Sequence, residues 1–391
     1  MSKNTENKIL NKKRERANVN EGEQNQLKDD IIDSVNFNLQ FTSNPTQLKF
    51  FQNLIDEKWD KHYGYENKFI IFKSVDDILY LIYTNSKSSI ILYNIEDNKK
   101  INEINNAHKY NITDLQHFTD KKNQTDLILS IPCWIYDIKL WDINRLECIY
   151  NFKNNDLTDQ LFSDASTFTA SFCSNLDNYL IIIGRYIIFE TDQEYPIEVY
   201  DFKGNLIKKI QDSNEGSYKI ICYYDEMVSK QFIISSYRNY VKSFYLDENK
   251  IYHKYFENFD NGNVSDSEDS GEQRGLENNI IIYKEEGIIK LIDLYEEGIV
   301  RIWNFHSAEL LKKIDIFGIY SICLWNNKYL FMGGVNNAIQ LFELKNGEII
   351  NSFLVHEDIV KTIRKMIHPK YGECLVSQSA YQEDIKLWIL S

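Results

Sequence analysis

Proline, glycine and long apolar runs are scarce in this chain of 391 residues, which contains 4 Pro and 15 Gly. So few prolines disfavour long structureless linkers, and no apolar run approaches the ~20 residues that a membrane-spanning helix requires. The first residues are polar and charged, so no secretory signal is visible. We therefore expect a cytoplasmic protein, and the basic cluster at 12–16 makes the nucleus the alternative.

Motifs for catalysis and ligand binding are also missing. The sequence contains no Walker-type phosphate loop, no Gly-x-Gly-x-x-Gly, no His-Glu-x-x-His and no Cys-x-x-Cys among its 6 cysteines. We therefore expect no catalytic residue, no cofactor and no metal ion, and we expect the cysteines to be free thiols buried in strands. Five histidines are scattered without the spacing of metal ligands: His62, His117, His253, His306 and His368.

Basic residues are fewer than acidic residues. The chain has 44 Lys and Arg against 58 Asp and Glu, which gives a net charge of −14 at pH 7. A surface of this sign repels nucleic acid and anionic membranes and attracts basic segments of other proteins. We expect other proteins as partners, no nucleic acid and no membrane, with the chain acting as a monomer inside a larger complex.

A recurring strand that ends in an aromatic side chain dominates the rest of the sequence. Ile-Lys-Leu-Trp-Asp-Ile at 138–143 is echoed with tryptophan at 300–305 and 385–390, and more loosely elsewhere. Repeats of roughly 40 to 45 residues with several strands each are typical of propeller blades. We predict an all-β fold over 34–391, a seven-bladed β-propeller with four strands in each blade. The aromatic positions are Tyr93, Trp141, Tyr200, Phe244, Trp303, Phe342 and Trp388.

The N-terminal segments have their own patterns. Residues 1–33 are polar and predict a disordered charged tail. Apolar and polar residues alternate over 35–41, which predicts a strand that supplies the outer strand of the last blade and closes the ring. Asn44 and Pro45 then have the composition of a helix start, so we predict a helical insertion at 43–64. It would pack on the propeller; a partner-binding helix is the alternative.

Three insertions share one place in the repeat. The helical insertion, a polar stretch at 153–166 and an acidic stretch at 257–279 each fall between the outer strand of one blade and the inner strand of the next. Such connections emerge on one face of a propeller, so we expect partners to bind there. Within the acidic loop, Ser265 precedes Glu268 by three residues and is a candidate phosphorylation site. The alternative is a passive insertion.

Two segments carry the same polar residues. The serine stands eleven residues, and the aspartate four residues, before the tryptophan in both copies. A hydrolase triad is not expected twice on equivalent repeats, and neither serine lies in a Gly-x-Ser-x-Gly elbow. We therefore predict structural roles. The two sets are His108, Ser130, Asp137 and Trp141, and His356, Ser377, Asp384 and Trp388.

With these residues the chain resembles the WD-repeat β-propeller family over about residues 67–390. The resemblance implies that the histidine, serine, aspartate and tryptophan of a blade join in a hydrogen-bond network that locks it. The resemblance is closest in blades two, five and seven, and in blade five Glu297 takes the aspartate position before Trp303. The other four blades carry Tyr or Phe instead of tryptophan and are expected to hold by packing alone.

The resemblance also implies a function. Propellers of this family typically hold peptides or proteins across the face rich in inter-blade loops, so we expect a non-catalytic protein-interaction scaffold. One alternative is a substrate receptor of a cullin-RING ubiquitin ligase, because such receptors often carry Trp-Asp-x-Arg after a third strand. The stretch from Trp141 to Arg145 has one residue more than that motif. A propeller hydrolase, the last alternative, would need an acid/base constellation in the central channel.

Overall fold

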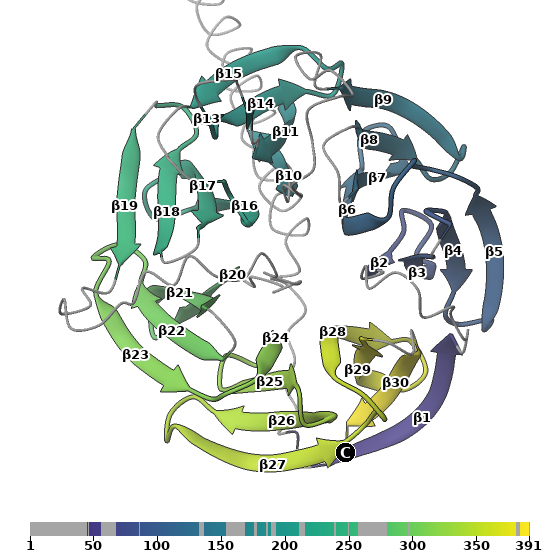
Figure 1. Cartoon of the computed structure of the whole chain (residues 1–391), viewed down its shortest axis with the longest axis vertical. Helices are drawn as coiled ribbons and strands as arrows, with labels where there is room; N and C mark the ends of the chain where they lie inside the picture. The colour runs from purple at the N-terminus through teal and green to yellow at the C-terminus, as the bar shows by residue number, and fades with distance from the viewer. Residues whose placement is uncertain are drawn as a thin grey trace, which may run out of the picture.

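Seven four-stranded antiparallel sheets surround a central axis in the computed structural model (Figure 1). The predicted all-β, seven-bladed propeller is therefore confirmed, and no helix occurs in the described part of the chain. The structure describes residues 45, 47–55, 68–85, 87–132, 137–153, 169–175, 178–184, 187–188, 193–210, 216–237, 240–248, 250–256, 280–295, 298–380 and 384–390.

The first four blades run from the axis to the rim in chain order, and the four strands predicted for blade one are confirmed. Blade one contains β2 (Phe69–Lys73), β3 (Leu79–Thr84), β4 (Ile90–Asn94) and β5 (Lys99–Ile104). Blade two contains β6 (Ile112–Asp120), β7 (Thr125–Pro132), β8 (Asp137–Asp142) and β9 (Glu147–Lys153). Blade three contains β10 (Thr169–Asn175), β11 (Asn178–Gly184), β14 (Ile197–Asp201) and β15 (Leu206–Ile210), and blade four contains β16 (Lys219–Asp225), β17 (Lys230–Ser236), β18 (Tyr240–Tyr245) and β19 (Ile251–Phe256).

The last three blades follow the same order, except that the final sheet takes its outer strand from the N-terminal part of the chain. Blade five contains β20 (Ile280–Glu285), β21 (Ile288–Tyr295), β22 (Ile299–Asn304) and β23 (Leu310–Asp315). Blade six contains β24 (Ile319–Trp325), β25 (Tyr329–Gly334), β26 (Ala338–Glu343) and β27 (Glu348–Leu354). Blade seven contains β28 (Val360–His368), β29 (Gly372–Ser379), β30 (Ile385–Leu390) and β1 (Leu48–Ile55).

The burial of a strand determines how clearly its apolar pattern can be recognised in the sequence. The second strand of blade two, β7, is buried from Asp126 through Pro132, whereas the outer strand β5 is mostly exposed. Inner positions are covered on both faces because neighbouring blades stack face to face, so their strands are almost continuously apolar. The described residues form an apolar cluster in each gap between neighbouring blades. The core is therefore a set of layers around the ring.

The outer strand of blade seven corrects two predictions. The place beside β30 is taken by β1, with Leu48 opposite Leu390 and Ile55 opposite Ile385, and not by 35–41. The same residues were expected to be helical, and that expectation is wrong for 48–55. Leu54 and Ile55 pack with side chains of blades one and seven, so apolar burial accompanies the pairing. Residues 35–41 and the tail 1–33 lie outside the described residues.

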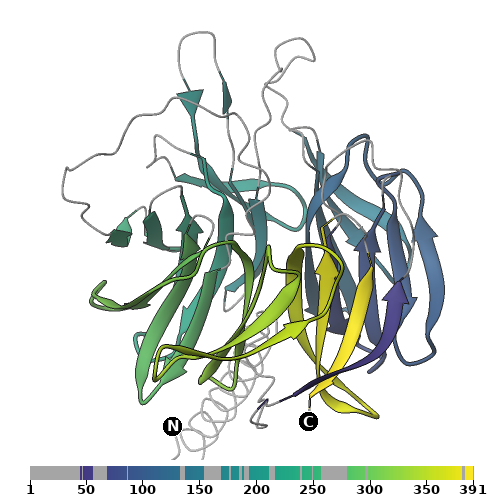
Figure 2. The same cartoon turned by 60° about the horizontal axis from the view of Figure 1, so that its bottom comes forward.

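The strand order divides the connections between two faces. Each outer strand ends, and each next inner strand begins, on what we call the long-connection face, where Phe317 and Leu354 also lie. The three longest connections between consecutive blades, 56–68, 154–168 and 257–279, join strand ends on this face. A ribbon of β12 (Ile187–Ile188) and β13 (Gln193–Glu194), inserted between β11 and β14, rises on the same side (Figure 2). The opposite, tight-turn face has connections of two to five residues.

Candidate functional site

Four of the motif residues meet inside blade seven. The Trp388 indole N–H donates to Ser377 Oγ over 2.8 Å, and His356 Nε2 lies 2.7 Å from the same oxygen. His356 Nδ1 lies 2.9 Å from Asp384 Oδ1. Because an indole can only donate and a carboxylate can only accept, Ser377 Oγ accepts from the Trp388 indole and Asp384 Oδ1 accepts from His356 Nδ1–H. Each of these buried groups then has a partner.

Asp384 anchors this chain. Its Oδ1 also accepts from Ser379 Oγ over 2.5 Å, and its Oδ2 lies 2.8 Å from Lys386 Nζ. Burial raises the pKa of Asp384, but the hydrogen bonds from His356, Lys386 and Ser379 outweigh burial and hold the pKa well below its usual range. The carboxylate is therefore ionised, and Lys386 compensates its charge.

Blade two repeats the arrangement. His108 Nε2 lies 2.6 Å from Ser130 Oγ, which accepts the Trp141 indole N–H over 2.7 Å. Burial, with a smaller effect of the charge on Lys139, lowers the pKa of His108 to about 3, so this imidazole is neutral and can accept from the serine. The side chain of Asp137 lies outside the described residues, and its place in the network stays a prediction.

Blade five departs from the expected pattern. The Trp303 indole donates to Asp293 Oδ1 over 2.6 Å, and Arg301 Nε donates to Asp293 Oδ2 over 3.0 Å. Asp293 opposes Arg301 in the sheet just as Ser130 opposes Lys139, so it stands at the serine position. Sequence reasoning missed it because the hairpin of blade five is one residue shorter. Glu297, the expected member, lies outside the described residues.

These networks are placed to hold blades together and not to activate a nucleophile. Ser130 and Ser377 have an exposed fraction of 0%, and each oxygen already engages an indole and an imidazole. A nucleophile must reach a substrate from a cleft, with an oxyanion site beside it. The geometry therefore gives neither serine a route to a substrate.

Two blades without tryptophan also contain polar contacts. In blade four, Ser235 Oγ donates to Ser217 Oγ over 2.8 Å, and both side chains are buried. Ser235 opposes Lys242 in the sheet, which is the register of the serine in blades two and seven. In blade three, the Tyr200 hydroxyl donates to Glu198 over 2.6 Å. The expectation that such blades hold by packing alone is therefore wrong for blade four.

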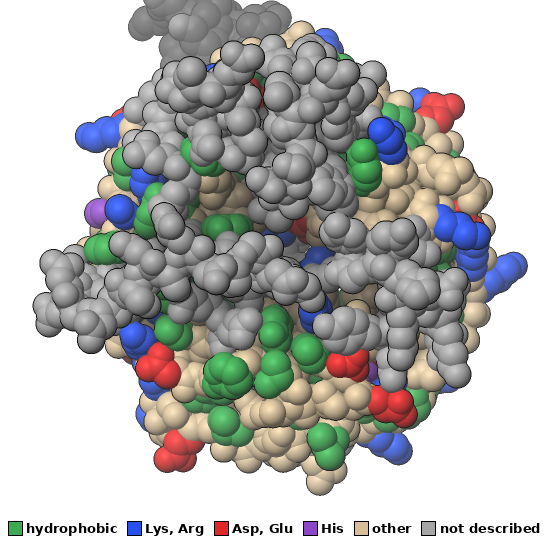
Figure 3. All heavy atoms as spheres, viewed as in Figure 1, with side chains coloured by type: hydrophobic (Ala, Val, Ile, Leu, Met, Phe, Trp, Pro, Cys, Tyr) green, Lys and Arg blue, Asp and Glu red, His purple; other side chains and the backbone are tan. Residues whose placement is uncertain are grey.

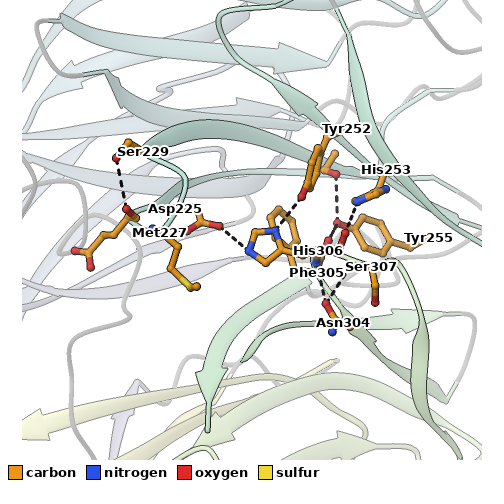
Figure 4. A network of polar contacts seen from close by, with 12 residues as sticks. Asp225, Met227, Ser229, Tyr252, His253, Tyr255, Asn304, Phe305, His306 and Ser307 are labelled. Atoms are coloured by element: carbon orange, nitrogen blue, oxygen red, sulfur yellow. Dashed lines mark hydrogen bonds and ion pairs between the residues drawn. The ribbon is translucent and has the colours of Figure 1, made fainter. Parts of the chain in front are cut away.

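A further polar cluster on the tight-turn face joins blades four and five (Figure 4). His306 Nε2 lies 3.0 Å from Oδ2 of Asp225, whose exposed fraction is 0%, and His306 Nδ1 shares a hydrogen bond of 2.9 Å with the Tyr252 hydroxyl. His253 Nε2 donates to the His306 carbonyl over 2.5 Å. Sequence reasoning treated both histidines as scattered, because the contact joins different blades and leaves no local pattern.

The long-connection face carries an apolar strip over blade six (Figure 3). Phe317, just before β24, has an exposed fraction of 82%, and Leu354, at the end of β27, has 83%. Val335, in the turn before β26, is partly exposed, and its N–H donates to the carbonyl of Gly318, the residue after Phe317, over 2.9 Å. Phe317 and Leu354 are the most exposed large apolar side chains among the described residues, so this strip is the strongest candidate for a contact surface.

The remaining predictions concern the acidic stretch, metal ions, membranes and the cysteines. Ser265 and the acidic stretch 257–279 lie outside the described residues, so the phosphorylation site stays a prediction. In the part of the chain that is described, no three His, Cys, Asp or Glu side chains are grouped as a metal site would require, and no helix is long and apolar enough to cross a membrane. Cys173, Cys222, Cys323 and Cys374 are buried and free, whereas Cys148 is exposed.

No protein-family model matches the chain, and no curated protein matches it either.

Proposed function

We propose that this protein is a non-catalytic interaction scaffold of the cytoplasm, a divergent member of the WD-repeat propeller family. Its partners are other proteins, bound on the long-connection face. The buried networks of blades two and seven support the family assignment, because His108 and His356 each meet a serine and a tryptophan on the positions that the family uses. They also support a rigid role, since satisfied buried networks fix one packing arrangement.

One observation carries the proposed binding role: the two faces are built differently. Connections on the tight-turn face have two to five residues, whereas the much longer connections 154–168 and 257–279 join strand ends on the other face. Loops on a rigid scaffold are where binding residues concentrate. The same face exposes Phe317 and Leu354, and exposed apolar strips on folded proteins mark contact surfaces.

Affinity purification with mass spectrometry of bound proteins tests this proposal. The wild-type chain is compared with a deletion of 260–275, a deletion of 156–166, and the double substitution Met227→Ser, Val228→Ser. The last variant is the matched control, because these side chains are 64% and 47% exposed on the tight-turn face. We expect partners to be lost with a deletion and kept with the control. Loss with the control alone would contradict the proposed face.

A substrate receptor of a cullin-RING ligase is the second candidate, and one observation favours it. Arg145 follows the third strand of blade two, and its side chain is 76% exposed beside Asp142, with Nε 3.6 Å from Oδ2. The pair thus presents the Asp and Arg of the receptor motif, although one extra residue separates them. This candidate requires a cullin adaptor in the wild-type purification and its loss with Arg145→Ala. Purification without an adaptor would end it.

A further inference from the structure

The apolar strip on blade six is bounded by acidic side chains. Asp315 is exposed two residues before Phe317, and Glu357 is exposed three residues after Leu354. Asp358, next in the chain, is partly exposed. An apolar centre with a charged rim is the usual composition of a specific protein contact, in which the apolar side chains supply affinity and the rim selects the partner.

The strip is also held in place before any partner arrives. The Val355 N–H donates to the Asn337 carbonyl over 3.1 Å, and Asn337 Nδ2 donates to the Glu357 carbonyl over 3.0 Å. A Cβ on Gly318 would lie 2.4 Å from Val335 Cγ2, so the two turns are in tight contact. Binding here would therefore order little new backbone, which keeps the entropic cost of association low.

We propose that this strip binds a short segment of a partner protein that presents large apolar side chains flanked by Lys or Arg. The inference rests on the proposed function and adds the place and the chemistry of the partner. Phe317 and Leu354 would contact the apolar side chains of the segment, and Asp315 and Glu357 would attract its basic ones. The net charge of −14 also attracts a positively charged partner at longer range.

The described ends of the chain lie away from the strip. The first paired residue of β1, Leu48, opposes Leu390 at the tight-turn end of blade seven, so the last described residues at both ends of the chain lie on the opposite face. The connection at 257–279 does begin on the right face, but its sequence is acidic around 266–272. Like charges on the rim repel it. A basic segment from another protein therefore fits better than this acidic connection.

Selection from a phage-displayed library of random twelve-residue peptides tests the proposal, with the full-length protein as bait. We expect enriched peptides that combine Leu, Phe or Trp with Lys or Arg. A synthetic copy of the most enriched peptide is then titrated by fluorescence anisotropy. Phe317→Ser and Leu354→Ser should each weaken its binding about tenfold or more, because exposed apolar anchors carry most of the energy of such contacts. Glu357→Lys should weaken it severalfold and reduce its dependence on salt.

The matched control is Ile207→Ser, which changes an apolar side chain 57% exposed on the outer strand of blade three. It should leave the affinity unchanged, and circular dichroism should show that all variants are folded. Enriched peptides whose affinity is unchanged by Phe317→Ser and Leu354→Ser would overturn the assignment of this strip. Peptides whose binding is lost with the deletion of 260–275 but not with Phe317→Ser or Leu354→Ser would also overturn the assignment of this strip, while leaving the proposed function intact. A selection that enriches no peptide would also overturn it.

Discussion

Ser377→Ala is the sharpest perturbation of the polar network in blade seven. Ser377 has an exposed fraction of 0%, and its oxygen joins the Trp388 indole to His356. Alanine fits the same space, so the change removes hydrogen bonds with little loss of packing. It leaves the indole N–H and the imidazole Nε2 without partners in the protein interior. Each of the two stranded groups costs about 1–3 kcal/mol, so we expect a loss of about 2–6 kcal/mol in the free energy of unfolding.

A double-mutant cycle separates the network from simple packing. Trp388→Phe removes the indole donor, so in that background Ser377→Ala strands one group fewer. We expect the two changes to cost about 1–2 kcal/mol less together than the sum of the single changes. Urea unfolding followed by far-ultraviolet circular dichroism measures all four proteins without depending on tryptophan emission. A cost below about 0.5 kcal/mol for Ser377→Ala, or strict additivity in the cycle, would refute the reasoning.

Three further predictions follow from described contacts. Truncation through residue 55 removes β1, exposes the edge of β30 and should abolish cooperative unfolding in calorimetry, whereas truncation through residue 44 should preserve it. As the pH falls from 6.5 to about 3, the unfolded chain protonates His108 while the folded chain does not, so the free energy of unfolding should decrease by up to about 1.4 kcal/mol per pH unit. Urea titrations measure this slope, and His108→Gln should flatten it. Arg301→Met should cost about 3–5 kcal/mol by leaving Asp293 buried without its cation, and adding Asp293→Ser should recover most of the loss in the same urea assay.

The blades could be predicted from the sequence because their third strands are buried on both sides. Burial keeps these strands apolar and leaves the aromatic position visible even where tryptophan has become Tyr93 or Phe342. Matching spacing also identified the serines that meet Trp141 and Trp388. Asp293 was missed since one residue is absent from its hairpin, so a fixed spacing pointed to the wrong neighbour.

The strand β1 shows why the closing segment could not be predicted. Its register with β30 shifts between Phe50 and Gln52 and again between Asn53 and Ile55. Each shift interrupts the alternation of apolar and polar residues, and the remaining apolar spacing imitates a helix. Long-range contacts such as Asp225 with His306 leave no local pattern at all. Nor does a sequence distinguish an exposed Phe317 from a buried phenylalanine.

Hydrogen exchange, measured by mass spectrometry on the complex with a partner recovered by affinity purification, tests the central claim most directly. The claim is that partners bind the long-connection face. We expect slower amide exchange at 316–319, 335–337 and 354–359 in the complex than in the free protein, with the turns at 226–229 and 305–309 unchanged. Slower exchange confined to those two turns, on the tight-turn face, would contradict the claim.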